Sequence, residues 1–132
     1  MADNTLHVTI ITPARAVFNA EATAVVVPAF DGELGVLPGH APLLALLGTG
    51  EVRVTTPAGA VDKLAIRGGF LQVGKNSVTV LTPESTAPGE AKAELLQQEL
   101  QKLDSEKPTK LEEREAQEIK RTWIKARQKV VA

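Results

Sequence analysis

The chain has 132 residues, of which 43% are hydrophobic and 23% charged, and its formal net charge is −1. This length allows one domain, or one domain with an appendage, and it suffices for a hydrophobic core. The near-neutral charge argues against nucleic-acid binding, and the absence of cysteine excludes disulfides and thiolate chemistry. We also expect neither a membrane-spanning helix, which needs roughly 20 apolar residues, nor a secretory signal in MADNTLHVTI.

Residues 1–83 are predicted to form a β domain. Apolar and polar residues alternate in several short runs that are bounded by turn residues, at 6–10, 52–55 and 78–81. The run TAVVVPAF is apolar at successive positions, which is typical of a strand buried on both faces. Many short strands with no helix between them predict an antiparallel β-sandwich or flattened barrel.

Residues 84–132 are predicted to form an antiparallel helical hairpin, which makes the fold class α+β. Apolar residues recur here every three or four positions, and Pro108 interrupts the pattern between two helices. We expect one apolar seam to hold the helices together, formed by Leu96, Leu100, Leu103, Ile119 and Trp123.

The end of the chain is cationic. It contains no acid after Glu118, and its five bases are Lys120, Arg121, Lys125, Arg127 and Lys129. Such residues complement the negative end of a helix dipole, but their number exceeds what one helical turn needs. Two interpretations stay open: a charged helix end, or a contact with the acidic surface of a partner.

The segment GFLQVGKN (69–76) resembles the phosphate-binding loop G-x-x-x-x-G-K-S/T, with Asn76 in place of the hydroxyl residue. A phosphate loop follows a strand and opens a helix, whose N-terminal amides bind the anion. Here FLQV alternates like a strand, GKN has the composition of a hairpin turn, and SVTVL is another strand. The segment therefore predicts a β-hairpin and not a nucleotide site.

His40 lies in a loop rich in glycine and proline, near the carboxylates of Asp31 and Glu33. A metal site would need more ligands, since His7 is the only other histidine and cysteine is absent. A catalytic base would need a nucleophile nearby, and no serine stands in a sharp turn beside His40. We therefore expect no metal and no catalytic residue, and we interpret this loop as a docking surface.

The segment GELGVLPGHAPLL (32–44) resembles the signature loop of the epsilon-subunit family of F-type ATP synthases. Three more segments agree with this family in the same order: LHVTIITP, AVVVP and IRGGFLQVGKNSVTVL. The resemblance spans most of the β part, and the helical hairpin falls where the family has one. It implies a non-catalytic central-stalk subunit that couples proton flow to ATP synthesis.

The resemblance also implies partners for particular residues. The sandwich would bind the gamma subunit, for which the apolar residues Leu43 and Leu44 are candidates. The loop would contact the polar loops of the c-ring, through Asp31, Gly32, Glu33 and His40. The protein would then be peripheral, held to the membrane only by the complex, on the cytoplasmic face of the bacterial inner membrane or the stromal face of a plastid thylakoid.

The hairpin of this family also has an extended form that enters the alpha/beta catalytic hexamer and blocks ATP hydrolysis. The resemblance implies that the five cationic residues of the last helix meet an acidic segment there. Some family members bind ATP on the hairpin through an I/L-D-x-x-R-A motif. This chain has TAPGEAKAELL at the corresponding place, so we expect no nucleotide cofactor.

Two other functions stay open on the sequence alone. One is a small-ligand-binding sandwich with an accessory hairpin, which predicts a single deep pocket. The other is a β-sandwich enzyme that uses His40 and Glu33 together, which requires these two side chains to lie close to each other.

Overall fold

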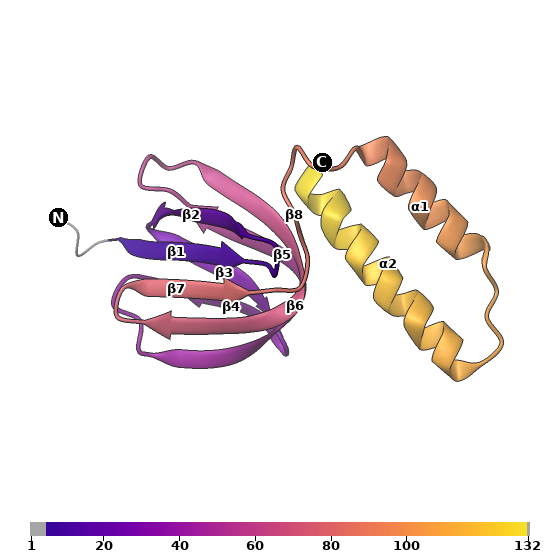
Figure 1. Cartoon of the computed structure of the whole chain (residues 1–132), viewed down its shortest axis with the longest axis horizontal. Coiled ribbons are helices and arrows are strands. Elements are labelled where there is room, and N and C mark those ends of the chain that lie inside the picture. Colours follow the sequence, from indigo (N-terminus) through magenta and orange to yellow (C-terminus); the bar gives the residue numbers. More distant parts are fainter. Residues whose placement is uncertain (1–4, 132) are drawn as a thin grey trace.

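The computed structural model describes residues 5–131 as a curled sheet of 8 strands followed by two helices (Figure 1). The strands are β1 (Leu6–Ile11), β2 (Ala16–Ala22), β3 (Ala24–Ala29), β4 (Gly32–Val36), β5 (Leu43–Thr55), β6 (Val61–Gly74), β7 (Ser77–Leu81) and β8 (Ser85–Thr86). The helices are α1 (Ala93–Ser105) and α2 (Leu111–Val131). The predicted α+β fold, a β-sandwich followed by a helical hairpin, is confirmed.

The strands follow the spatial order β2-β1-β7-β6-β5-β3-β4, and β8 pairs with β6. Two details differ from the prediction. β1 and β7 run parallel, although the other pairs are antiparallel. The sheet also continues beyond the predicted boundary at residue 83, because Ser85 and Thr86 pair with Ile66 and Ala65 of β6.

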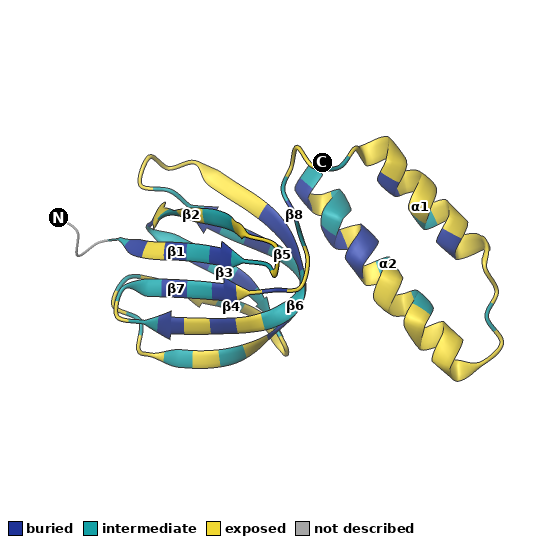
Figure 2. Ribbon diagram, in the orientation of Figure 1, coloured by how far each residue is buried: buried dark blue, intermediate teal, exposed yellow. Residues whose placement is uncertain are grey.

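Side chains on the inner face of the sheet form the core. In β1, Leu6, Val8 and Ile10 are buried, whereas the residues between them are more exposed. Figure 2 shows the same alternation of buried and exposed residues along the other strands. The core also contains side chains of the other long strands: Val25, Val27, Val36, Leu47, Val52, Val54, Leu64, Ile66, Leu71, Val73, Val78 and Val80.

The inward-facing positions change parity halfway along β5 and β6. In β6, Leu64 and Ile66 face the core, and the next core residues are Leu71 and Val73, five positions further on instead of four or six. Gly68 and Gly69 lie between them, with φ of 69° and 125°, a region that residues with a side chain rarely adopt. A Cβ on Gly69 would also overlap the carbonyl oxygen of Leu81.

β5 makes the same change between Leu47 and Val52, and the ladder keeps its register across the bend, with Leu47 opposite Gly69 and Thr49 opposite Arg67. The two strands therefore bend together. The outer surface of this ladder is divided into two parts, one before and one after the bend in β5.

α2 lies between α1 and the sheet (Figure 1). One side of α2 packs on Ala65 of β6 through Trp123, Ala126 and Val130. The neighbouring side packs on α1, where Leu96 and Leu103 contact Ile124, and Leu100 lies partly buried beside them. Adjacent helix positions point about 100° apart, so Trp123 and Ile124 contact different surfaces.

Two parts of the predicted seam need correction. Ile119 is 56% exposed and contributes nothing to the core. It lies about one turn before Trp123. Toward its first residues, α2 moves away from the sheet (Figure 1). Trp123 is buried, but it packs on the sheet and not on α1.

Candidate functional site

An exposed apolar surface covers the outer side of the ladder before the bend. It consists of four residues on three neighbouring strands, which we call the outer apolar face: Leu44, Leu46, Phe70 and Leu81. Leu46 lies opposite Phe70, and Phe70 lies opposite Leu81, so their side chains share one side of the sheet. Leu44 is 72% exposed and Phe70 52% exposed. Contiguous apolar surfaces of this kind mark contact sites for other macromolecules.

A cavity of about 390 Å³ adjoins this face and shares Phe70 and Leu81 with it. Its other lining residues come from the end of β1, the bend in β6 and the segment after β7: Ile11, Thr12, Pro13, Gly69, Thr82 and Pro83. The close approach of β6 to β7 at Gly69 shapes this hollow. The cavity extends the apolar surface beyond the three paired strands.

Of the two residues predicted for a gamma contact, Leu44 points outward but Leu43 does not. Leu43 is partly buried and packs against the core, because successive residues of a strand point to opposite sides. The sequence prediction missed Leu46, Phe70 and Leu81. Only the strand register brings these three together, and the sequence carries no direct signal of that register.

Asp31 lies in the turn between β3 and β4, and Gly32 and Glu33 are the first residues of β4; we call these three exposed residues together the β3–β4 turn. Gly32 has φ of 137°, which suits glycine. Glu33 is bound by Arg53 of β5, whose Nη1 and Nη2 donate to its two carboxylate oxygens at 2.9 and 3.2 Å. These hydrogen bonds hold the pKa of Glu33 below its ordinary value of 4.5, and the positive charges of Arg53 and Lys129 act in the same direction.

His40 lies away from this turn, beyond the other end of β4. The neighbouring Gly39 donates its N–H to Asn76 Oδ1 in the β6–β7 turn, at 3.3 Å. The His40 ring is turned toward its own loop, with Nδ1 2.7 Å from the carbonyl oxygen of Ala41. A five-residue strand, about 17 Å long, separates the two sites.

The four residues predicted for a c-ring contact therefore do not form one edge. Asp31, Gly32 and Glu33 stay together, whereas His40 belongs to the opposite end of the sandwich. The same separation is incompatible with an enzyme in which His40 and Glu33 act on one substrate. Among residues 5–131, no group of three histidine or carboxylate side chains could hold a metal ion.

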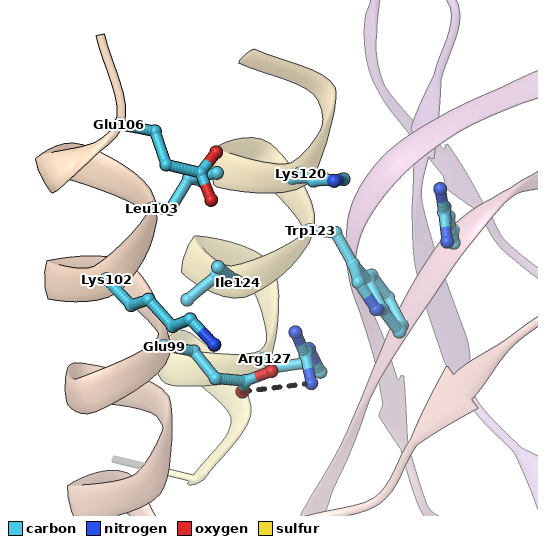
Figure 3. Close-up of a pocket in the computed structure, with 9 residues that line it drawn as sticks. Glu99, Lys102, Leu103, Glu106, Lys120, Trp123, Ile124 and Arg127 are labelled. Carbon is cyan, nitrogen blue, oxygen red and sulfur yellow. Dashed lines mark ion pairs between the residues drawn. The ribbon is translucent and has the colours of Figure 1, made fainter. Parts of the chain in front are cut away.

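The cationic residues of α2 differ in their surroundings. Arg121 donates to Asp104 Oδ1 of α1 at 2.6 Å and pairs with Glu118 of its own helix. Arg127 lies 3.5 Å from Glu99 Oε2, and its guanidinium stands 5.1 Å from the centre of the Trp123 ring. Figure 3 shows the ion pair between Glu99 and Arg127 and the Trp123 ring beside it. Cation–π contact of this kind stabilises buried aromatic residues.

Lys120, Lys125 and Lys129 are exposed. A cavity of about 280 Å³ is lined mainly by residues of α1 and α2, among them Leu103, Trp123 and Ile124 (Figure 3). Arg67 of β6 also lines it. The folded hairpin thus leaves three lysines at the surface and holds the two arginines in intramolecular ion pairs.

No helix in the described part of the chain combines the length and the apolar character needed to cross a membrane.

Comparison with known proteins relates the greater part of the chain to one family. The family model described as "ATP synthase, Delta/Epsilon chain, beta-sandwich domain" matches residues 5–87. The ATP synthase epsilon chain of Campylobacter fetus is 39% identical over 71% of this chain and 74% of its own length. That of Streptomyces avermitilis is 35% identical over 76% and 82%. The match to the Pelotomaculum thermopropionicum epsilon chain, at 44% identity, spans only 61% of this chain and 60% of that relative.

Two solved structures have the same fold over almost the whole chain. A chain of the Euglena gracilis mitochondrial ATP synthase covers 98% of this chain, and 82% of its own, with a TM-score of 0.85 at 22% identity. A chain of the Tetrahymena thermophila mitochondrial ATP synthase central stalk and c-ring covers 96% of each, with a TM-score of 0.68 at 16% identity. The arrangement of sandwich and hairpin therefore recurs in distant proteins.

The Arg53–Glu33 contact predicts the titration of Glu33. Its carboxylate is the favoured partner of Arg53, so it should titrate below 4.5 in the folded chain, and Arg53→Gln should move its midpoint up toward the ordinary value. Because the folded pKa is lowered, the contact stabilises the fold at neutral pH, and this stabilisation is lost as the pH falls through the folded pKa. Side-chain carboxyl NMR measures both midpoints. A Glu33 midpoint that Arg53→Gln leaves in place would contradict the assigned cause.

Proposed function

Because the chain belongs to the family of ATP synthase epsilon chains, we propose that it is a non-catalytic rotor subunit in the central stalk of an F-type ATP synthase. Its task is to join the gamma subunit to the c-ring, so that proton flow through the ring drives ATP synthesis. It is peripheral to the membrane and reaches the membrane only through the complex. The host membrane is the bacterial inner membrane, with the subunit on its cytoplasmic face; the stromal face of a thylakoid is the alternative.

The observation that carries this proposal is the outer apolar face. An isolated β domain gains nothing from placing Leu44, Leu46 and Phe70 in water, but a stalk subunit that is permanently bound to another chain needs such a surface. Permanent interfaces are more apolar than the rest of a protein surface, and aromatic residues at their centres contribute most of the binding energy. We assign the gamma contact to this face and its adjoining cavity.

The c-ring contact is assigned to the β3–β4 turn. Asp31 and Glu33 are exposed carboxylates on a short, glycine-containing turn, a chemistry that suits the basic side chains of a polar loop. Arg53 fixes the direction of Glu33, whereas Asp31 is the more freely available charge of the two. His40 is not included in this contact, because it lies at the other end of the sandwich.

The hairpin is assigned a regulatory contact with the catalytic hexamer. α2 has 21 residues and is about 31 Å long, and it offers a row of cations to an acidic surface once the hairpin extends. The folded hairpin packs on the sheet through few large side chains, with Trp123 the main one, so another surface can compete with the sheet for α2.

A small-ligand-binding sandwich is the weaker alternative. Its core is filled by interlocked valine, leucine and isoleucine side chains. Three cavities, of about 280, 390 and 410 Å³, lie between the helices, beside the outer apolar face, and between β2, β6 and the segment after β8. The family assignment supports the stalk function and gives no support to this alternative.

The outer apolar face predicts the effect of a charge on gamma binding. Phe70→Glu should weaken binding of the purified chain to the gamma subunit by at least about 30-fold, since aromatic residues at an interface centre are worth on the order of 2 kcal/mol or more. Val61→Glu is the matched control, because Val61 stands on the same strand at 50% exposure but outside this face. Biolayer interferometry gives both affinities. Equal affinities for the two variants would contradict the assignment.

The β3–β4 turn predicts a coupling defect. Asp31→Lys should lower proton-driven ATP synthesis in reconstituted vesicles while the chain still folds and binds gamma, because the new charge repels basic loops. Asp31 is preferred to Glu33 here, since Glu33 also holds Arg53. Asp62→Lys, an equal charge reversal at an exposed position of β6, should leave synthesis unchanged. Synthesis at the wild-type rate with Asp31→Lys would refute the c-ring contact.

The cationic helix predicts relief of inhibition. Reversing the exposed Lys120 and Lys125 to glutamate should raise ATP hydrolysis by the assembled enzyme several-fold, as should truncation after Asp104. Rising ionic strength should weaken inhibition in the wild type, because exposed charges are screened beyond about 10 Å. Lys110→Glu, an exposed cation just before α2, is the control. If both the truncation and the double reversal leave hydrolysis unchanged, the hairpin is structural only.

A further inference from the structure

Arg53 stands between two carboxylates that belong to different parts of the molecule. Its Nη1 donates to Glu33 Oε2 at 2.9 Å and to Glu51 Oε1 at 3.1 Å, and its Nη2 donates to Glu33 Oε1 at 3.2 Å. Glu33 belongs to the exposed β3–β4 turn, and its side chain is 58% exposed. Glu51 belongs to the outer side of β5 after the bend, and its side chain is only 10% exposed.

α2 accounts for the burial of Glu51. Glu51 lies directly opposite Ala65 on β6, so the two side chains share the outer side of the sheet. Ala65 is fully buried by Trp123, Ala126 and Val130 of α2, and α2 also contacts β5. The last turns of α2 therefore lie over Ala65 and against β5, the strand that carries Glu51. A carboxylate beneath an apolar helix face is costly unless a cation neutralises it, and Arg53 makes that contact.

The opposite side of Arg53 is also linked to α2. The positive charge of Lys129 on α2 also lowers the pKa of Glu33, although less than Arg53 does. When α2 is packed on the sheet, the net charge is zero for the cluster of Glu33, Glu51, Arg53 and Lys129. When α2 leaves, Lys129 leaves with it, and the remaining three groups carry a net charge of −1.

We propose that Arg53 is a positioning residue that joins the β3–β4 turn to the seat of α2, so that a cation bound by Glu33 changes how firmly the hairpin is held. Arg53 neutralises Glu51 beneath the helix, and Glu33 keeps the Arg53 guanidinium in place through two of its three hydrogen bonds. A basic partner at Glu33 competes with Arg53 for the same two oxygens. Such a partner therefore loosens Arg53, and with it the neutralisation of Glu51 beneath α2, so that α2 packs less firmly on the sheet.

The link stands on the intramolecular geometry and is testable without any partner. In the full chain, Arg53→Gln should speed hydrogen exchange of the α2 amides from Trp123 to Val130 by about tenfold or more, because it leaves the buried Glu51 unpaired. Amides of β1, in the core, should keep their wild-type exchange and so report that the sandwich is intact. Lys63→Gln is the matched control, since Lys63 lies opposite Arg53 on β6 and forms no part of this cluster.

A double-mutant cycle tests the connection between the turn and the helix. Glu33→Gln and Lys129→Gln should each speed exchange of α2 by a few-fold, and together they should do less than the product of the two effects, because each removes part of one charge cluster. Multiplicative effects in this cycle would overturn the proposal, as would α2 exchange that is unaffected by Arg53→Gln. If Arg53→Gln loses protection throughout the chain, Glu51→Gln is added to the same variant. The double variant should again show slow exchange in α2, because the unpaired carboxylate is gone. Exchange in α2 that stays fast in the double variant would also overturn the proposal.

Discussion

The bend of the β5–β6 ladder at Gly68–Gly69 is the constraint on which the other features depend. Gly68 and Gly69 adopt positive φ, and Gly69 approaches β7 so closely that a side chain would overlap the Leu81 carbonyl. The bend reverses which positions of each strand face the core. Before it, β5 turns apolar side chains to the outside; after it, β5 and β6 turn outward the surface that receives α2. One ladder thus provides both the outer apolar face and the seat of the hairpin.

Charge distinguishes the two outer surfaces. The outer apolar face has no ionic residue among its four members, whereas the surface beneath the hairpin contains Glu51, Arg53 and Arg67 around the small apolar Ala65. An apolar surface suits a permanent partner, because its exposure to water is costly at all times. A seat in which charged pairs surround a small apolar contact is held less firmly and depends on ionic conditions. The chain therefore offers one surface for lasting attachment and another for a contact that can be broken.

The sequence predicted the fold class, because period-two alternation and helical spacing are local signals, and both survive in the structure at β1, β7 and α1. It also identified the β6–β7 turn correctly, since Asn76 takes positive φ between two strands. It did not show that Leu43 and Leu44 point to opposite sides of β5, with Leu43 against the core, because an unbroken apolar run does not show which positions face inward. It failed at Ile119, because a helical stripe does not reveal where the supporting sheet ends. The structure separates His40 from Glu33, because Glu33 lies at the start of β4 and His40 follows the far end of that strand.

The packing order of the hairpin sets an order of disassembly. α1 rests on α2 through Leu96, Leu103 and Ile124, and α2 rests on the sheet, so α1 occupies the outermost layer (Figure 1). α1 loses its packing surface when α2 moves, whereas α2 keeps its contact with the sheet when α1 moves. α1 can therefore peel from α2 while Trp123 remains in place, but α2 cannot leave the sheet without carrying α1 along or parting from it. α2 comes second in the chain, but it is the helix that holds α1 to the rest of the molecule.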